Sequence, residues 1–277
     1  MNAPNTPRLS VSTWSLHRTL GWTYTDAPGN TTDRQAKPTY GEGSLSLLEL
    51  PAQVAQRGIY TLEICHFHLP SRETAYLETL RAALDAAGVE LFSLLVDDGD
   101  ITHPEQGRRD LDWMSAWVET AGQLGAQRAR VIAGKQPYSP ETMRRSREGL
   151  RELAARGQAC GVRMTTENWY PLLSRPEYVH ELLDSLEGTV GLNADFGNWD
   201  GPTKYADLAS LFPRAESCHA KCAFTAPRTP DAEDYRCCLE LAQQAGFSGP
   251  YTLIYDGPDA DEWTGLALEA DLVRSFL

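Results

Sequence analysis

Eight short runs rich in apolar and β-branched residues recur along this chain of 277 residues, separated by longer stretches with the period of amphipathic helices. Strands that alternate with helices pair in parallel, because each helix returns the chain across the sheet. Eight such units predict an α/β fold, a single (β/α)8 TIM barrel. The runs begin at residues 9, 60, 89, 128, 162, 189, 215 and 251.

Helix boundary signals support this division. Ser139 is an expected N-cap followed by a proline, and residues 174–177 match a capping box. Glycines that suit helix C-termini precede five of the runs, at positions 58, 88, 125, 161 and 246. Because this punctuation continues along the whole chain, we expect one domain over residues 1–277. The alternative, an open doubly wound sheet, would carry a Gly-rich dinucleotide loop after the first strand, which this sequence lacks.

One segment, residues 21–43, breaks the regular pattern. It is rich in Gly, Pro, Thr and Asp, has no apolar period, and follows the first predicted strand. A long loop in that place lies at the C-terminal end of a barrel, where active sites are built. It is either a lid or a plain insertion. Trp22, Tyr24 and Tyr40 favour a lid, because aromatic side chains can cover a sugar ring.

Composition excludes several classes of function. The net charge of −13 disfavours nucleic acid as a partner, because a phosphate backbone would be repelled. Neither a signal peptide nor an apolar run of about 18 residues is present, so no membrane span is expected. Six cysteines without a secretory signal suit reduced thiols. We expect a cytoplasmic protein.

Four of the predicted strands end on an acidic or imidazole residue, namely Glu167, Asp195, His219 and Asp256. These residues lie 24 to 37 positions apart, about one strand and helix each, so a barrel would place them at one rim. Buried carboxylates are costly unless they are paired or bind metal. Carboxylate oxygens with one imidazole suit Mn²⁺, Mg²⁺, Co²⁺ or Zn²⁺. The sequence therefore predicts one divalent metal ion.

Alternation along a strand decides which of these side chains face together. His219 and Lys221 share one side of their strand, whereas Cys218 and Cys222 face the other side. This arrangement excludes a zinc site built from the Cys-His-x-x-Cys spacing. Lys221 thereby becomes a candidate acid or base beside the metal.

Aromatic and basic residues accompany the same strand ends. Trp14 and Trp169 could stack on a sugar or pack in the core. Arg130 and Lys135 could contact a substrate anion, and Arg130 could instead pair with a barrel carboxylate. The acidic run at residues 97–103 is interpreted as a turn that caps the next helix, because it lacks the spacing of an EF-hand.

Three motifs resemble those of a known family. Thr166-Glu-Asn168, Asp195-Phe-Gly-Asn198 and His219-Ala-Lys221 look like the metal-binding ends of strands five, six and seven in xylose-isomerase-like TIM barrels. The family includes sugar-phosphate isomerases, ketose 3-epimerases, inosose dehydratases and, more distantly, metal-dependent apurinic endonucleases. The resemblance extends from about residue 9 to the last residue.

The resemblance implies roles for individual residues. Glu167, Asp195 and His219 would be metal ligands, and Asp256 would take the fourth place. The epimerases carry a glutamate there, which also serves as one of two acid/base groups. The resemblance further implies that Glu63, His66 and Asn198 lie near the substrate, Asn198 at a position where several relatives carry a substrate-binding histidine.

Such a site predicts proton-transfer chemistry on a sugar or polyol. The metal acts as a Lewis acid on a hydroxyl and an adjacent carbonyl oxygen, and Glu167 removes a proton to give an enediolate. Asp256 or Lys221 would be the acid. The leading hypothesis is therefore a metal-dependent isomerase or epimerase of a sugar or sugar phosphate.

Three alternatives stay open to different degrees. Aspartate at position 256, in place of glutamate, favours a metal-dependent dehydratase of a keto-polyol or inosose, and equally permits a sugar-binding barrel without activity. A phosphodiesterase acting on abasic DNA is disfavoured by the acidic charge and by a total of six histidines. The sequence does not decide the sugar, the metal or whether the chain forms a homo-oligomer.

Overall fold

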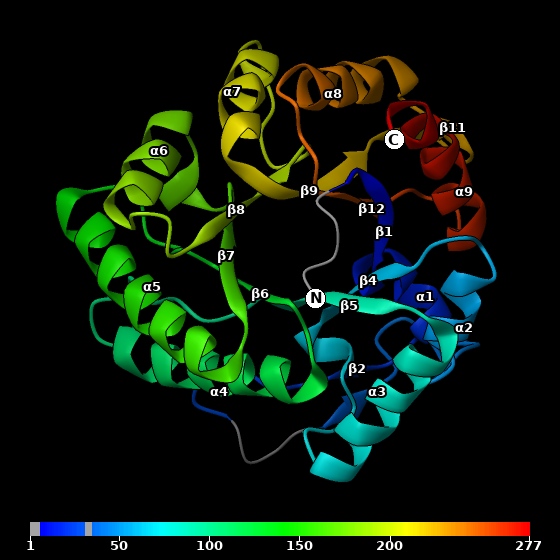
Figure 1. Ribbon diagram of the computed structural model, residues 1–277, viewed down its shortest axis with the longest axis horizontal. Coiled ribbons are helices and arrows are strands. Elements are labelled where there is room, and N and C mark those ends of the chain that lie inside the picture. The colour runs from blue at the N-terminus through cyan, green and yellow to red at the C-terminus, as the bar shows by residue number, and fades with distance from the viewer. Residues whose placement is uncertain (1–5, 31–34) are drawn as a thin grey trace.

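In the computed structural model, which describes residues 6–30 and 35–277, eight parallel strands close into a barrel (Figure 1). The strands follow one another around the barrel in chain order, and β1 closes the sheet between β12 and β4. All eight predicted strands are present, and the predicted (β/α)8 barrel is confirmed. The barrel strands are β1 (Arg8–Ser12), β4 (Thr61–Cys65), β5 (Glu90–Val96), β6 (Arg128–Val131), β7 (Arg163–Glu167), β8 (Gly191–Asp195), β9 (Ala215–Cys222) and β12 (Pro250–Tyr255).

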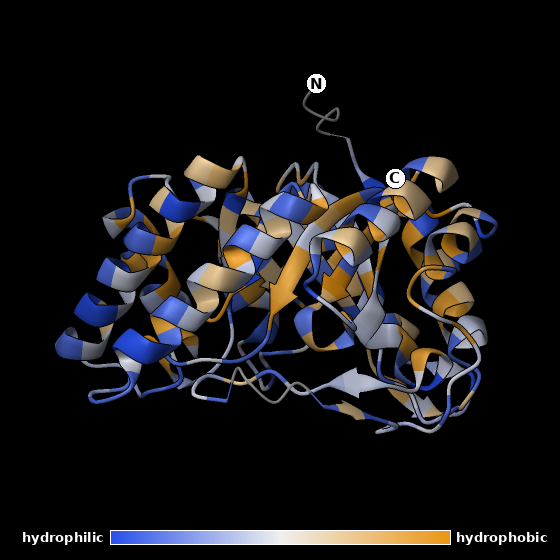
Figure 2. Ribbon diagram, turned by 90° about the horizontal axis from the view of Figure 1, so that it is seen from below, coloured by the Kyte–Doolittle hydropathy of each residue, from blue (hydrophilic) through white to orange (hydrophobic). Residues whose placement is uncertain are grey.

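Helices surround this barrel on the outside (Figure 1). In α5, for example, the buried residues Met143, Ser146, Leu150 and Leu153 recur every three or four positions, so that one face packs inward. Figure 2 shows hydrophobic strand segments, in orange, between the helices. Within the described residues, every helix is too short or too polar to cross a membrane. The helices are α1 (His17–Leu20), α2 (Leu50–Ala55), α3 (Thr74–Ala87), α4 (Gly107–Leu124), α5 (Pro140–Cys160), α6 (Pro176–Ser185), α7 (Lys204–Leu211), α8 (Ala232–Gln244) and α9 (Glu262–Val273).

The predicted helix boundaries are mostly confirmed. The five glycines that precede predicted strands all have positive φ, between 65° and 76°. Ser139 caps α5, because its side chain accepts a hydrogen bond from the backbone N–H of Thr142. The capping box expected at Ser174 is wrong. Ser174 donates to the carbonyl of Pro171, and α6 begins after Arg175, whose side chain makes no cap.

Ion pairs occupy the inside of the barrel at the amino ends of the strands. Arg8 Nε lies 2.7 Å from Glu90, and Arg163 pairs with Glu216. These long side chains come from the first inward positions of their strands. They fill that end of the barrel, so the opposite end is the one available for a site.

The segment 21–43 is attached to the barrel at several points. It contains the antiparallel pair β2 (Thr23–Tyr24) and β3 (Ala36–Lys37), and Asp26 accepts a hydrogen bond of 2.6 Å from Trp113 Nε1. Its two ends meet so closely that a Cβ on Gly21 would lie 2.3 Å from the backbone nitrogen of Gly43. Residues 31–34 lie outside the described residues. A role as a lid stays a prediction. The other small sheet pairs β10 (Phe224–Ala226) with β11 (Thr229–Pro230).

Candidate metal centre

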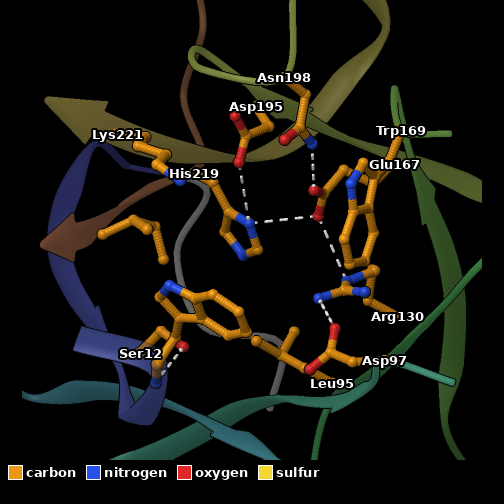
Figure 3. Close-up of a pocket in the computed structure, with 12 residues that line it drawn as sticks. Ser12, Leu95, Asp97, Arg130, Glu167, Trp169, Asp195, Asn198, His219 and Lys221 are labelled. Carbon is orange, nitrogen blue, oxygen red and sulfur yellow. Dashed lines mark hydrogen bonds and ion pairs between the residues drawn. The ribbon is translucent and has the colours of Figure 1, made fainter. Parts of the chain in front are cut away.

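A cavity opens at the C-terminal ends of the barrel strands (Figure 3). Its lining divides into an apolar side and a polar side. The apolar side includes the side chains of Trp14, Leu95 and Ile254. The polar side includes Asp97, Arg130, Glu167, Asp195, Asn198, His219 and Lys221. Small-molecule sites commonly combine an apolar wall with a few convergent polar groups.

Strand register brings three of the predicted ligands together on the polar side. Asp195 at the end of β8 is the direct partner of His219 on β9, and Glu167 ends the next strand, β7. Nδ1 of His219 lies 3.1 Å from Glu167 Oε2 and 3.5 Å from Asp195 Oδ2. One candidate ligand atom from each residue lies within 4.8 Å of the other two. All three side chains are buried.

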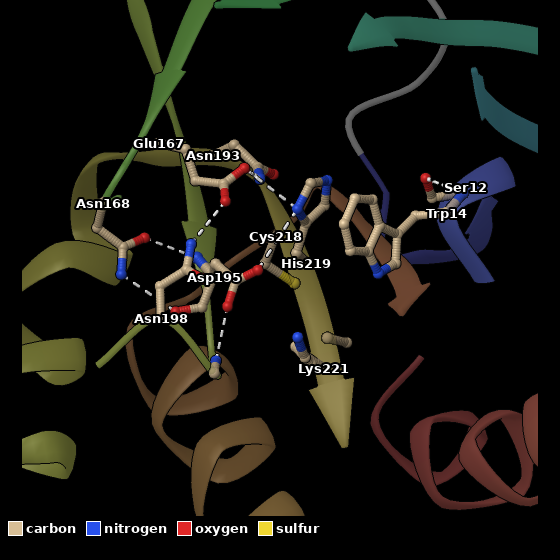
Figure 4. A network of polar contacts seen from close by, with 12 residues as sticks. Ser12, Trp14, Glu167, Asn168, Asn193, Asp195, Asn198, Cys218, His219 and Lys221 are labelled. Carbon is tan, nitrogen blue, oxygen red and sulfur yellow. Dashed lines mark hydrogen bonds and ion pairs between the residues drawn. The ribbon is translucent and has the colours of Figure 1, made fainter. Parts of the chain in front are cut away.

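Amide groups hold the two carboxylates in place (Figure 4). Asn198 donates to Glu167 Oε1 at 2.7 Å, and Asn193 donates to Glu167 Oε2 at 2.9 Å. The backbone N–H of Gly197 donates to Asp195 Oδ1 at 2.6 Å. Each carboxylate therefore keeps a fixed orientation toward His219, as a preorganised ligand set requires.

A third carboxylate lies on the other side of the imidazole. Glu63, on β4, accepts a hydrogen bond from His219 with 2.9 Å between Oε2 and Nε2, and its side chain is 1% exposed. It lies beneath the cavity and is not one of the residues that line it. The structure therefore places Glu63 against a candidate ligand, away from the position of a direct substrate contact.

Neighbouring charges shift the pKa values of Glu167 and His219. Burial by itself would raise the pKa of Glu167, but the charges of Arg130 and His219 outweigh burial and hold the pKa below its usual range. Burial would lower the pKa of His219, but Glu167 and Glu63 reverse the effect and place that pKa well above its usual value. The cluster thus favours a positive charge at its centre.

The same donor set fits a divalent cation. Two carboxylates and an imidazole nitrogen converge on one small volume, which suits Mg²⁺, Mn²⁺, Co²⁺ or Zn²⁺. With Glu63 behind them, three buried carboxylates surround a single imidazole, and Arg130 is a buried cation that contacts one of them, Glu167.

The structure does not bring Asp256 to the other three predicted ligands. Its side chain is 54% exposed and accepts a hydrogen bond of 3.0 Å from Lys221 Nζ. The reason is the position of the strand end, because β12 stops at Tyr255 and Asp256 lies beyond it. The cavity instead meets Ile254, the register partner of Lys221. The inward position at the end of strand eight is therefore aliphatic.

Arg130 supplies a buried positive charge beside the candidate ligands. Its Nη2 lies 2.5 Å from Asp97 Oδ1, and its Nε lies 3.3 Å from Glu167 Oε2. Arg130 thus pairs with barrel carboxylates, which was one of its two predicted roles. It also lines the cavity, so the other predicted role, contact with a substrate anion, stays a prediction. Lys135 instead pairs with Asp98 and does not line the cavity.

The remaining predicted site residues separate into two groups. Trp14, Trp169, Asn198 and Lys221 line the cavity, where they can meet a ligand. His66 does not line the cavity. Its ring is buried, and its Nδ1 accepts a hydrogen bond from the backbone N–H of Asp97. His66 thus holds the segment whose carboxylate pairs with the Arg130 guanidinium.

Sequence reasoning missed two kinds of cavity residue: the aliphatic Leu95 and Ile254, and Asp97, which it assigned to a turn. Ile254 could have been found by alternation, since it lies two positions after the inward-facing Thr252, itself the register partner of His219. The acidic run 97–103 contains a turn at residues 101 and 102, in which Asp100 accepts hydrogen bonds from Thr102. The run does not cap the next helix as expected, because α4 begins after Gln106, whose side chain makes no cap. The first carboxylate of the run, that of Asp97, points toward Arg130 and the cavity (Figure 3).

Comparison with known proteins gives a consistent picture of the fold. A family model described as xylose isomerase-like TIM barrel matches residues 51–270. A xylose isomerase-like TIM barrel protein from Mycobacterium smegmatis, solved in complex with magnesium, has a TM-score of 0.68 and 16% identity, with 100% of both chains covered. No curated protein matches the sequence.

Two sugar epimerases are also similar in structure. D-psicose 3-epimerase from Clostridium cellulolyticum H10, solved with D-tagatose, has a TM-score of 0.67 and 16% identity over 84% of this chain and 94% of its own. The 3-keto-D-glucoside 4-epimerase from E. coli has a TM-score of 0.66 and 15% identity over 83% of this chain and 94% of its own. At such identities the likeness establishes a shared fold.

Proposed function

Because this chain belongs to the xylose isomerase-like TIM barrel family, we propose that it is a divalent-metal-dependent isomerase or epimerase of a sugar or sugar phosphate. The buried cluster of Glu167, Asp195 and His219 in the cavity is the observation that carries the proposal. Sugar epimerases and a magnesium complex among the similar structures support the same chemistry.

The proposed ligands are the three clustered side chains, with His219 binding through Nδ1. A divalent ion held there would polarise the carbonyl and hydroxyl oxygens of a bound sugar. Glu167, whose depressed pKa keeps it ionised at neutral pH, accepts the proton from the carbon next to the carbonyl. The C–H electron pair moves into a carbon–carbon double bond, and the carbonyl π pair moves to oxygen, giving an enediol(ate).

Lys221 is the proposed second acid/base group. It lines the cavity on the same side of β9 as His219, and its Nζ is held by Asp256 at 3.0 Å. We propose that its ammonium exchanges a proton with the neighbouring substrate oxygen while Glu167 returns its own proton to the adjacent carbon. That sequence converts an aldose to a ketose with no net change in atoms.

The aliphatic Ile254 influences which reaction is favoured. Epimerisation at one carbon needs a second group on the opposite face of the sugar, and the inward position of strand eight offers no carboxylate. Isomerisation needs one base and one acid at neighbouring atoms. The cavity wall therefore supports isomerisation more strongly than two-carboxylate epimerisation.

A dehydratase is the second candidate, favoured by the same Lys221. An ammonium group can protonate a departing β-hydroxyl after Glu167 has removed the proton, which expels water and leaves an enol that becomes a ketone. The substrate would then be a keto-polyol or inosose.

Deuterium exchange tests the proposal and separates the two reactions. The metal-loaded protein is incubated in D₂O with aldoses, ketoses, their phosphates and an inosose. We expect deuterium at a carbon beside the carbonyl, measured by NMR and mass spectrometry, without loss of water. Loss of water from the product would assign the dehydratase. Absence of carbon-bound deuterium across the panel would contradict both.

Two variants assign the proton transfer. Glu167→Gln should slow exchange by roughly 10²–10⁴-fold, the usual contribution of a general base. Glu181→Gln is the matched control, because Glu181 contacts Tyr138 on the outer surface and lies outside the cavity. Equal exchange rates in the two variants would exclude Glu167 as the base.

A further inference from the structure

The carboxylate of Glu63 is buried deep in the barrel, under the cavity. Among the described residues, its hydrogen-bond partner is His219, at 2.9 Å. The neighbouring inward positions hold small hydroxyl side chains, since Ser12 and Ser93 are register partners of Glu63 and Thr252 is the register partner of His219. The sequence therefore places one large acidic side chain among serines and a threonine, directly against the imidazole.

A buried carboxylate in such surroundings is expensive without a specific partner. Hydroxyl groups could in principle solvate it, but Ser93 Oγ and Thr252 Oγ1 have no hydrogen-bond partner among the described residues, and neither donates to Glu63. Arg130 pairs with other carboxylates. The imidazole is thus the group that stabilises Glu63, and Glu63 in turn constrains the imidazole.

The two ring nitrogens of His219 have different environments. Nδ1 points to Glu167 and Asp195 (Figure 4). Nε2 points the other way, to Glu63. A carboxylate can only accept a hydrogen bond, so Nε2 must carry a proton to satisfy Glu63. A neutral imidazole protonated at Nε2 has its lone pair on Nδ1, which is the atom that faces the other two candidate ligands.

We propose that Glu63 is a positioning residue, which fixes His219 in the tautomer that presents Nδ1 to a divalent ion. The inference rests on the proposed function, since it assigns a role toward the metal that function requires. A carboxylate behind a histidine ligand orients the ring and increases its basicity, and loss of such a partner typically weakens metal binding about 10–100-fold.

Metal affinity measured by equilibrium dialysis with Mn²⁺ is the first test. Glu63→Leu replaces the hydrogen-bond acceptor by an apolar side chain of similar size. We expect the Kd of this variant for Mn²⁺ to rise roughly tenfold to a hundredfold. Glu63→Gln keeps an acceptor oxygen without the charge and should fall between Leu and wild type. Glu216→Gln is the matched control, because Glu216 is a carboxylate at the amino ends of the strands, paired with Arg163. Its Kd should equal that of wild type.

Proton NMR of the Mg²⁺-loaded protein gives a readout that a merely structural role would not move. In wild type we expect a downfield, slowly exchanging Nε2–H resonance of His219, as a hydrogen bond to a carboxylate requires. In Glu63→Gln this resonance should move upfield and exchange faster. This measurement in wild type does not depend on whether Glu63→Leu folds.

The outcomes distinguish the inference from the proposed function. Folded Glu63 variants with wild-type metal affinity, or a wild-type protein without the hydrogen-bonded Nε2–H, would overturn the role of Glu63 and leave the proposed function standing. A wild-type protein that binds no ion, yet shows the Nε2–H resonance bonded to Glu63, would instead contradict the proposed function.

Discussion

At the scale of single residues, Ile254 bears most directly on the choice between the proposed isomerisation and epimerisation. It faces the cavity and is the register partner of Lys221, whereas the resemblance to the epimerases implies the metal-binding glutamate at position 256. Asp256, two positions later, is exposed and paired with Lys221. With an aliphatic side chain at the inward position, the proposed ion would have three protein ligands, and this wall of the cavity offers no carboxylate base.

This account predicts the effect of adding the carboxylate. In Ile254→Glu we expect Mn²⁺ to bind about tenfold more tightly than in wild type, because a fourth charged ligand would face the cluster. The metal-free variant should unfold at a lower urea concentration, because a buried carboxylate without a partner destabilises the fold. Dialysis and urea titration measure the two effects.

Ile254→Gln serves as the matched control. Glutamine has nearly the same shape as glutamate but no charge, so it should not tighten Mn²⁺ binding. Equal affinities in the glutamate and glutamine variants would show that position 254 does not face the ion.

At the scale of elements, the segment 21–43 meets the barrel through an aromatic stack. The ring of His17 lies 4.4 Å from that of Tyr40 and 4.7 Å from that of Trp14, measured between centroids. Trp14 also lines the cavity. Movement of this segment would therefore reach the cavity wall through His17, which connects the predicted lid to the site.

The stack makes stability depend on pH. Burial lowers the pKa of His17 from 6.5 to about 4. Between these values the unfolded chain binds the proton more readily than the folded protein, so stability is full above pH 6.5 and falls as the pH drops toward 4. The contribution of His17 should decrease by about 2 kcal/mol between pH 7 and pH 5.

Urea unfolding at the two pH values, in wild type and His17→Gln, measures this contribution. The variant should lose less stability on acidification than wild type does. His66 and His68 are present in both proteins, but the ring of His68 contacts that of His17 and the charge of His17 helps to lower the pKa of His68. The difference therefore reports His17 together with its effect on His68. An identical loss in both proteins would contradict the assignment.

Elements differ in how far sequence predicts them. The strands were predictable because each is a local apolar run, and Ser139 was predictable as a cap because its partner, Thr142, is three residues away. The failure at Ser174 has a local cause, since the side chain completes the preceding turn at Pro171. The anchoring of residues 21–43 joins Asp26 to Trp113, 87 positions apart, and no local pattern encodes it.

At the scale of the whole molecule, closure of the barrel is what assembles the site. Glu167, Asp195 and His219 were predictable together, because ends of consecutive parallel strands meet at one rim. The partnership of Glu63 with His219 spans 156 positions and crosses the barrel interior, so it depends on closure and side-chain packing. The place of Ile254 in the cavity wall was not predictable either, because it depends on the residue at which β12 ends.

The two ends of the barrel differ in the charged residues that they hold. The amino ends of the strands hold pairs of arginine and glutamate, whereas the carboxyl ends gather carboxylates around one imidazole and Arg130. This gathering of buried carboxylates is the basis on which we propose a divalent ion. Substrate identity, assembly state and cellular location stay predictions.

Equilibrium dialysis of the metal-free protein against Mn²⁺ tests the central claim most directly. We expect one ion per chain in wild type, binding weakened roughly a hundredfold or more in Asp195→Asn and His219→Ala, and unchanged binding in Asp256→Asn, whose side chain lies outside the cluster. A wild-type chain that binds no ion, or that binds it equally well after Asp195→Asn, would contradict the account.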